Sequence, residues 1–313
     1  VCYSIISIPL ALFAETTNSS ERIYYNEKGE ITNYVCGALS VSWQYDEIGN
    51  RICSMKSSIT NYYSSNSLNQ YTSISNNLGY SANLQYDADG NLTQDHRFKY
   101  VWDAENRLTE IRPAIFLNEG IMIKNSYDPF NRRVIKEVLK LVDLDSSQPP
   151  SPTNGRLENV YTSIFIYDQT RILLELCTYP DNTTNTNLYH WGADLSGTLD
   201  GAGGVGGLLA VTHNQRTFIP LADADGNITA YVSDQGEIVA RFHYDPFGET
   251  IHESGELKDL FRFRFSTKYL DDETLFYDYG RRFYDPWLGR WLNRDPVGEV
   301  DGANLYAMLK NCP

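Results

Sequence analysis

The residue types that most often carry metal or nucleophilic chemistry are few in this chain and lie far apart. Among 313 residues there are five cysteines and five histidines: Cys2, Cys36, Cys53, Cys177, Cys312, His96, His190, His213, His243 and His252. No Cys-x-x-Cys pair occurs, and no histidine neighbours a cysteine at the spacing of a zinc site. No Gly-x-Ser-x-Gly elbow or triad spacing is present either. We therefore expect no metal, no cofactor and no disulfide framework.

Two stretches that resemble ligand-binding motifs predict turns instead. Residues 201–206 fit G-x-G-x-x-G, but a dinucleotide loop must open a helix, and residues 208–212 have the pattern of a strand. We expect a loop or β-bulge there. The Asp-Ala-Asp-Gly stretches at Asp87 and Asp223 lack the glycine and glutamate that an EF-hand needs at positions six and twelve. They predict hairpin turns.

The elements that would position any site are predicted to be β-strands. Tyrosine occurs 23 times and aromatic residues make up 13% of the chain, and Tyr, Val, Ile and Thr favour half-buried strands. Gly, Asn and Asp recur as turn signals, and long stretches of 3.6-residue periodicity are missing. Apolar residues (42%) and charged residues (21%) are at ordinary globular levels. The composition predicts an all-β protein that is long enough to bury a substantial core.

The charge balance excludes one large class of partner. Acidic residues number 40 against 26 Lys plus Arg, which gives a formal net charge of -14. Most of such a surface repels a phosphate backbone, so we expect no nucleic-acid partner. The charges are interspersed rather than collected in blocks, which is typical of a solvated surface.

The amino-terminal residues form an apolar segment. Residues 1–14 carry no charge and are too few to span a membrane as a helix. Residues 1–20 are either a truncated signal peptide or leader, with a cleavage point near Ala14, or the first buried strand of a clipped chain. No other transmembrane candidate occurs. The signal-peptide interpretation favours a secreted or cell-surface location.

A repeat runs along the chain: an aromatic residue and Asp, or a near relative of this pair, then a Gly or Asn turn and a short apolar strand. The copies begin at Tyr25, Tyr45, Tyr86, Trp102, Tyr127, Tyr167, Asp223 and Tyr244. Where the aromatic is present it ends a strand, the Asp side chain bonds turn amides, and Gly or Asn accepts a positive φ. Each copy therefore predicts a β-hairpin. Because one hairpin is marginal in water, successive antiparallel hairpins must pair into a continuous sheet.

These copies resemble the YD repeats of bacterial RHS proteins, of the C components of insecticidal toxin complexes, and of teneurins. The resemblance covers residues 21–313. It implies that the hairpins wind as a spiralling strip into part of a large hollow shell. We expect a shell segment over residues 21–265 and a compact RHS-associated core over 266–313. A complete shell needs many more repeats, so the resemblance implies that this chain supplies the last portion.

The carboxyl-terminal block carries the most specific resemblance. Residues 277–291 read YDYGRRFYDPWLGRW, followed by NRDPVG at 293–298, NLY at 304–306 and NCP at 311–313. This is similar to the RHS-associated core, with its pattern R-[YF]-Y-D-P-x-x-G-R-[WF], then D-P-x-G, N-x-Y and N-x-P. In the family this core closes the shell.

The resemblance also implies an activity, because the family's core works as an aspartate-type autoprotease. By the motif, its arginine is Arg282 and its aspartate is Asp295. A carboxylate can activate water or accept a proton, and a guanidinium can stabilise developing charge. The alternative is that the two residues form a structural ion pair. The family's downstream D-P-x-G-L segment is absent before Pro313, so we expect self-cleavage of a longer parent and not of this chain.

Three functions remain open at this point. The first is a structural one: a shell segment whose parent encloses and delivers a carboxyl-terminal toxin or effector polypeptide, with a secretion-system or cell-surface partner. The second is self-cleavage itself, through Arg282 and Asp295. The third is a cell-surface adhesion or carbohydrate-binding YD-repeat protein without cargo, which would use exposed Tyr and Trp as stacking platforms.

Overall fold

The computed structural model describes residues 21–114, 120–143 and 155–313, and in them the chain is nearly all antiparallel β-structure. The all-β prediction is confirmed. The leader predicted for residues 1–20 lies outside the described residues. In the described parts of the chain, no helix has both the length and the apolar character needed to cross a membrane.

A meander of hairpins makes up two sheets, in which each strand pairs with the next strand along the chain. The seven-stranded sheet contains β1 (Arg22–Tyr25), β2 (Ile31–Cys36), β3 (Leu39–Tyr45), β4 (Arg51–Lys56), β5 (Ile59–Ser65), β6 (Tyr71–Asn76) and β7 (Ser81–Asn83). The fourteen-stranded sheet contains β8 (Gln85–Tyr86), β9 (Leu92–Gln94), β10 (Phe98–Trp102), β11 (Leu108–Pro113), β12 (Ile121–Tyr127), β13 (Arg133–Asp143), β14 (Gly155–Asp168), β15 (Arg171–Thr178), β16 (Thr184–Trp191), β17 (Leu208–His213), β18 (Arg216–Ala222), β19 (Ile228–Ser233), β20 (Ile238–Tyr244) and β21 (Thr250–Ser254). We call these two sheets together the strip.

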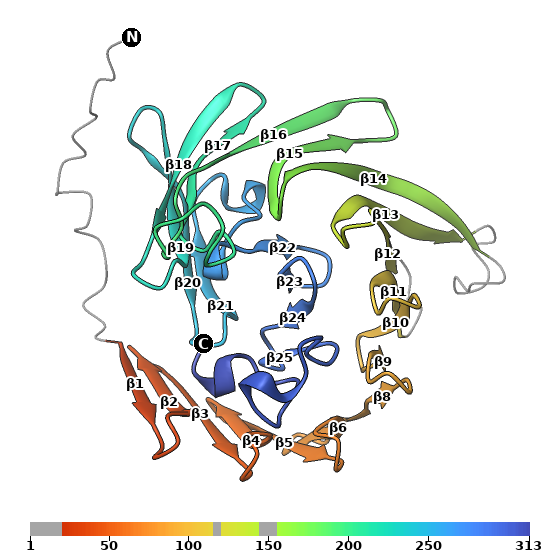
Figure 1. The fold of residues 1–313 in the computed structure, drawn as a ribbon, viewed down its shortest axis with the longest axis vertical. Helices are drawn as coiled ribbons and strands as arrows, with labels where there is room; N and C mark the ends of the chain where they lie inside the picture. The colour runs from red at the N-terminus through yellow and green to blue at the C-terminus, as the bar shows by residue number, and fades with distance from the viewer. Residues whose placement is uncertain (1–20, 115–119, 144–154) are drawn as a thin grey trace.

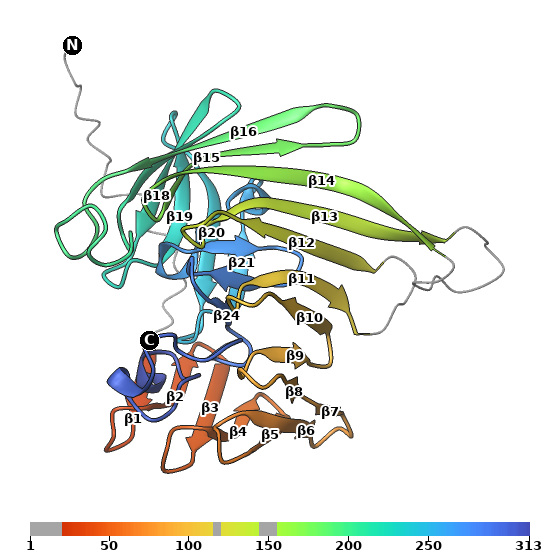
Figure 2. The same ribbon diagram turned by 45° about the vertical axis from the view of Figure 1, so that its right-hand side comes forward.

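The strip curves around a third sheet. In Figure 1 it bends from β1 through β6 and β10 to β14, and then back through β18 to β21. The four-stranded inner sheet lies within this curve and contains β22 (Tyr269–Asp271), β23 (Phe276–Asp278), β24 (Phe283–Asp285) and β25 (Arg290–Trp291). Short 3-10 turns flank it: η2 (Lys258–Leu260), η3 (Phe265–Thr267), η4 (Glu299–Asp301) and η5 (Leu309–Asn311). Figure 2 shows the long strands β12–β16 projecting to one side. The predicted spiralling strip is confirmed.

The repeat forms the same turn in seven of its eight copies. The side-chain Oδ1 of the Asp or Asn accepts the backbone NH of the fourth residue after it, in turns that begin at Asn26, Asp46, Asp87, Asp103, Asp128, Asp223 and Asp245. The third residue after it is Gly or Asn and has a positive φ in all seven. The predicted roles of the Asp and of the Gly or Asn are confirmed.

Two observations depart from the repeat as the sequence defines it. The copy at Tyr167 is a two-residue turn, in which Asp168 pairs with the Arg171 guanidinium at 2.5 Å. Asn66 and Asn76 form the common turn although no aromatic residue precedes them. The turn therefore depends on the acceptor side chain and not on the aromatic.

The aromatic has a separate task that the sequence pattern does not reveal. In five copies, and also at Trp191, the Tyr hydroxyl or Trp indole NH donates to a carbonyl just after an earlier turn. The bonds run from Tyr45 to Ile31, Trp102 to Leu92, Tyr127 to Leu108, Tyr167 to Arg133, Trp191 to Ile172 and Tyr244 to Ile228, all at 2.7–2.9 Å. Each bond ties one hairpin to the one before it. Phenylalanine would remove this hydrogen bond between hairpins.

The inner sheet is buried on both faces. Neighbouring residues point to opposite faces of a strand, and both members of the pair Phe276 and Tyr277, and of the pair Phe283 and Tyr284, are at most 4% exposed. The tyrosines pack in one hydrophobic cluster with β14–β20, and the phenylalanines pack in another with β5–β12. The inner sheet is therefore the core that the strip surrounds.

The carboxyl-terminal segment binds the turns of the strip. Asn311 Nδ2 donates to the Gly49 carbonyl at 2.9 Å, and the Tyr306 hydroxyl donates to the Gly90 carbonyl at 2.8 Å. Arg290 Nη2 donates to Asn50 Oδ1 at 2.8 Å. The asparagine, tyrosine and arginine of the carboxyl-terminal motif are thus the groups that hold this segment against the YD turns.

The two ends of the strip meet at a contact that we call the seam, formed by β2–β4 and by the turn between β20 and β21. Phe247, at the tip of this turn, is fully buried and packs edge-on against Trp43, with ring centroids 5.0 Å apart. Lys56 and Glu249 form a salt bridge across the seam at 2.7 Å. The curved strip thus forms a ring. Its two ends are joined by side-chain contacts, because β1 and β21 do not pair through their backbones.

The turn geometry makes a prediction at Asp46, whose Oδ1 accepts the NH groups of Ile48 and Asn50. We expect Asp46→Ala to lower the free energy of unfolding by about 1–3 kcal/mol, because two turn amides lose their acceptor. Asp46→Asn should cost less, because its amide oxygen can accept the same two amides as Asn26 and Asn66 do in their own turns, and only the bond from Asn50 Nδ2 to Asp46 Oδ2 is lost. Urea unfolding measures both variants, and equal losses would contradict the role given to the side-chain oxygen.

A second prediction concerns Asp245 at the seam. Burial, with the nearby Glu249 carboxylate, raises the pKa of Asp245 to about 7. Because the folded pKa exceeds the unfolded value near 4, the stability that this group contributes is complete below pH 4 and is lost as the pH rises to 7. Asp245→Asn should therefore stabilise the protein at pH 8, by up to about 4 kcal/mol, and the gain should shrink towards pH 4.

The matched control is Asp128→Asn. Burial opposes ionisation there, but hydrogen bonds from Arg132 outweigh it and lower the pKa of Asp128. This contribution is present above the unfolded pKa and is lost in acid, so the control variant should be less stable than the wild type at neutral pH. Urea unfolding at several pH values compares the two variants, and a pH-independent difference for Asp245→Asn would refute the assignment.

Candidate functional site

The two residues assigned by resemblance lie together in the structure. Arg282 immediately precedes β24, and Asp295 follows β25. Their side chains form an ion pair, with Arg282 Nη2 at 2.8 Å from Asp295 Oδ2. Their role stays a prediction, but the inner sheet brings them into direct contact.

Aromatic rings fix the arginine. The guanidinium carbon of Arg282 lies 4.1 Å from the centroid of the Trp291 ring, which is a cation–π contact. Tyr279 packs edge-on against Trp291 at 4.9 Å, and its backbone NH donates to the Arg282 carbonyl at 3.0 Å. Arg282 is therefore held by a ring from β25 and by the loop that precedes β24.

The aspartate is held by its own turn. Asp295 Oδ1 accepts the Val297 NH at 2.9 Å, and its backbone NH donates to the Leu305 carbonyl at 3.0 Å. One carboxylate oxygen is thus committed to the Asp-Pro-Val-Gly turn and the other faces the guanidinium. The Asp and Gly of this motif build the turn, because the Gly298 NH donates to the Asp295 carbonyl.

The pair is only partly shielded from solvent. The side chains of Arg282 and Asp295 are 16% and 18% exposed, whereas Arg133 and Asp271, which pair at 2.6 Å between β13 and β22, are 1% and 0% exposed. Burial opposes the ionisation of Asp271, but Arg133 and Lys136 outweigh it and hold its pKa well below the ordinary range. The buried pair ties the inner sheet to the strip, while Arg282 and Asp295 remain within reach of another group.

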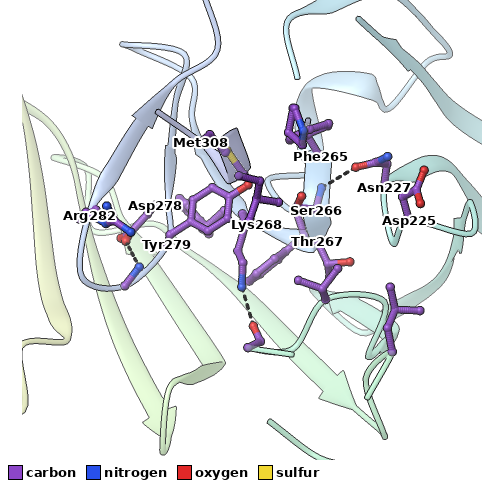
Figure 3. Close-up of a pocket in the computed structure, with 18 of the residues that line it drawn as sticks. Asp225, Asn227, Phe265, Ser266, Thr267, Lys268, Asp278, Tyr279, Arg282 and Met308 are labelled. Atoms are coloured by element: carbon purple, nitrogen blue, oxygen red, sulfur yellow. Dashed lines mark hydrogen bonds between the residues drawn. The ribbon is translucent and has the colours of Figure 1, made fainter. Parts of the chain in front are cut away.

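Both residues line a cavity of about 1660 Å³ on the concave side of the strip. Its wall includes strip residues such as Tyr167 and Trp191, and Cys312 and Pro313 also border it. Figure 3 shows Arg282, Asp278, Tyr279 and Lys268 on the inner-sheet side of this space. A polypeptide segment in the cavity can therefore approach the ion pair.

Two further ionisable groups at the cavity were missed by sequence reasoning. Burial lowers the pKa of Lys268 to about 8, and its ammonium group donates to the Gly203 carbonyl. Burial raises the pKa of Asp278, although Arg133 lies at 3.1 Å. Asp278 carries a weak signal, since it follows Tyr277 as a Tyr-Asp pair, whereas nothing in the sequence distinguishes Lys268.

The glycine-rich stretch is a loop, as predicted, and it forms part of the cavity wall. Residues 192–207 contain turns and no helix. Asp194 Oδ2 accepts the NH groups of Ala202 and Gly204 at 2.6 and 3.1 Å, so the backbone amides bind this internal carboxylate. The Asp87 and Asp223 stretches are likewise turns of the repeat.

An aspartate beside an arginine offers two kinds of chemistry in general. A carboxylate can accept a proton or activate a water molecule, and an adjacent guanidinium can donate hydrogen bonds to a carbonyl that develops negative charge. Both groups sit on rigid elements of the core, so their relative geometry is set before any segment arrives.

Known proteins share both the sequence pattern and the fold. The family model for the teneurin YD-shell matches residues 203–305. The tRNA nuclease WapA of Bacillus subtilis (strain 168) is 30% identical over 283 residues, which are 87% of this chain and 10% of that protein. Toxin subunit YenC2 of Yersinia entomophaga is 41% identical over 88 residues, 26% of this chain and 9% of that protein.

A solved structure has the same fold over nearly the whole chain. The Tc holotoxin pore of Photorhabdus luminescens, which contains a TccC3 variant, superposes with a TM-score of 0.58 at 18% identity, over 95% of this chain and 16% of that one. This chain spans about a tenth of the length of the WapA relatives that it matches. The strip and inner sheet are thus a shell fold found within much longer proteins.

The two ion pairs differ in burial, so we expect an Asp-to-Asn substitution to lower the free energy of unfolding by different amounts in each. Asp271→Asn removes the carboxylate that Arg133 and Lys136 share and leaves these two buried cations with only Asp278 and Glu273 as charged partners. We expect a loss of about 3–5 kcal/mol in the free energy of unfolding. Asp295→Asn affects a partly exposed pair and should cost less than about 1 kcal/mol. Urea unfolding of the two variants tests this difference. A loss of several kcal/mol for Asp295→Asn would favour a structural role for that pair.

Proposed function

Since the chain is an RHS-type YD-shell protein, we propose that it forms part of a capsule that encloses and delivers a toxin or effector polypeptide carried by a longer parent. One observation carries this proposal: the cavity on the concave side of the strip is bordered by Cys312 and Pro313. A segment that followed Pro313 in a longer protein would begin at this cavity. The enclosed space would then receive it directly.

The character of the cavity wall supports this role. Tyr34, Tyr167 and Trp191 border it together with aliphatic residues and twelve Asp, Glu, Lys and Arg residues. Aromatic side chains with polar tips can contact both the apolar and the polar parts of a partly unfolded polypeptide. The space is far smaller than a folded domain, so encapsulation needs the further repeats of the parent.

The relatives support a toxic cargo and partner subunits. Two of them bear the names tRNA nuclease and toxin subunit, and TccC3 has been crystallised together with TcdB2. By analogy, the parent of this chain would carry an effector at its carboxyl end and associate with a second subunit of an export or delivery system. We propose a secreted or cell-surface location for it.

A second activity, self-cleavage, is favoured by the placement of Arg282 and Asp295. The ion pair borders the same cavity as Cys312 and Pro313, so a bond in a following segment can reach it. Asp295 would activate the attacking water or accept a proton, and Arg282 would stabilise the oxyanion. Cleavage would separate the cargo from the shell without releasing it from the enclosed space.

The experiment uses the parent protein, extended beyond Pro313 to its natural end. We expect intact mass spectrometry of the purified wild type to show two pieces that elute together in gel filtration, with the smaller piece resistant to added protease until the shell is unfolded. Asp295→Asn should leave the chain uncut. Asp225→Asn, which alters another carboxylate bordering the cavity, is the matched control and should still be cut.

Three results would count against the proposal. An uncut wild type would remove the self-cleavage activity, and loss of cleavage in Asp225→Asn as well would show a general sensitivity to cavity charge. A carboxyl-terminal piece that is digested as fast as the free polypeptide would refute encapsulation. If that result came with specific retention on a glycan array, adhesion would be the better function.

A further inference from the structure

Three potential metal ligands from distant parts of the sequence meet at the seam. They are Glu21 just before β1, Cys36 at the end of β2, and His243 near the end of β20. One ligand atom of each lies within 4.8 Å of the others. In the described parts of the chain, this is the one group of three such side chains that could share an ion.

The three groups converge on a single nitrogen. The Cys36 sulfur lies 4.0 Å from His243 Nε2, and a Glu21 carboxylate oxygen is in hydrogen-bond contact with the same atom. In a tetrahedral zinc site, Zn–S and Zn–N bonds of about 2.3 and 2.0 Å place sulfur and nitrogen about 3.6 Å apart. The observed separation needs only a small adjustment to receive a metal ion between the two atoms.

The ligand set indicates the kind of metal. A thiolate, an imidazole and a carboxylate together suit Zn²⁺ and other borderline divalent transition metals, and do not suit Mg²⁺ or Ca²⁺, which prefer oxygen ligands. Glu21 and His243 are 52% and 36% exposed, and Cys36 is partly buried. An ion can therefore enter from solvent, and water can fill a fourth position.

A buried tyrosine supports the imidazole. The Tyr34 hydroxyl lies 3.1 Å from His243 Nε2 and 3.5 Å from the Tyr244 carbonyl oxygen. When a metal takes Nε2, this hydroxyl can donate to the Tyr244 carbonyl instead, so metal binding leaves no buried polar group unpaired.

We propose that Glu21, Cys36 and His243 form a binding site for a divalent transition metal of the zinc type, which links the two ends of the strip at the seam. Cys36 belongs to the seven-stranded sheet and His243 to the fourteen-stranded sheet. These sheet ends share no backbone hydrogen-bond ladder. A coordinated ion would add a strong link where the ring is otherwise closed by the Phe247 contact and the Lys56–Glu249 salt bridge.

A simple ion pair is the competing explanation. Glu21 and a protonated His243 would attract one another without any metal. That explanation gives Cys36 no part, whereas the proposed site requires its thiolate as a ligand. The involvement of the thiol therefore separates the two explanations.

The first test titrates the purified, metal-stripped chain with ZnCl₂ by calorimetry and with CoCl₂ by absorbance. We expect one ion per chain, and with Co²⁺ a thiolate-to-metal charge-transfer band together with the visible bands of tetrahedral coordination. Cys36→Ser should abolish the charge-transfer band, and His243→Gln should weaken binding by more than about tenfold. Cys53→Ser and His190→Gln are matched controls at other strands and should bind like the wild type.

The second test needs no variant. Zn²⁺ should slow the alkylation of Cys36 by iodoacetamide, as measured by peptide mass spectrometry, while Cys53 in the same molecules reacts at an unchanged rate. Zn²⁺ should also raise the melting temperature of the wild type and of Cys53→Ser but not of Cys36→Ser. Failure to bind Zn²⁺ or Co²⁺, or binding that survives both Cys36→Ser and His243→Gln, would overturn the proposal. Circular dichroism checks that each variant is folded.

Discussion

A curved strip of hairpins can bury its concave face only against something else, and the inner sheet β22–β25 is what it packs against. The contact includes a charged group of residues, because Arg133 and Lys136 of β13 reach Asp271 of β22 at 2.6 and 2.8 Å where solvent is excluded. Placing these charges in the core costs desolvation energy, which only close and correctly aligned pairing offsets. The network therefore fixes β22, the first strand of the inner sheet, against β13 of the strip.

The repeat contains two kinds of hydrogen bond, one within its own turn and one to an earlier hairpin. The Asp or Asn oxygen closes its own turn, and the Tyr or Trp donor reaches back to an earlier hairpin, as Tyr127 does to Leu108. Turn closure and strip assembly are thus separate, which explains why Asn66 can form the turn without an aromatic neighbour. The carboxyl-terminal segment uses the same turns as docking points through Tyr306 and Asn311.

The candidate site gains its geometry from this assembly. Arg282 and Asp295 lie in loops that flank short strands of the inner sheet, with Trp291 packed on the guanidinium. The core is fixed on both faces, so a partly exposed ion pair can be held rigidly at a cavity without being buried itself. Such a partly exposed pair contributes little to the free energy of folding, in contrast to the buried pair of Arg133 and Asp271.

The sequence by itself determined the local chemistry: the all-β class, the hairpin at each Tyr-Asp copy, and the identities of Arg282 and Asp295 through a motif. These features depend on residues close together in the chain, where turn preferences and spacing act directly. It could not find Lys268 at the cavity, nor the approach of Cys36 to His243, because those residues become neighbours only when the strip has curved and closed on itself. Spacing rules for metal ligands fail for such a pair, since they describe sites built within one short segment, and closure of the ring is decided by packing across the seam.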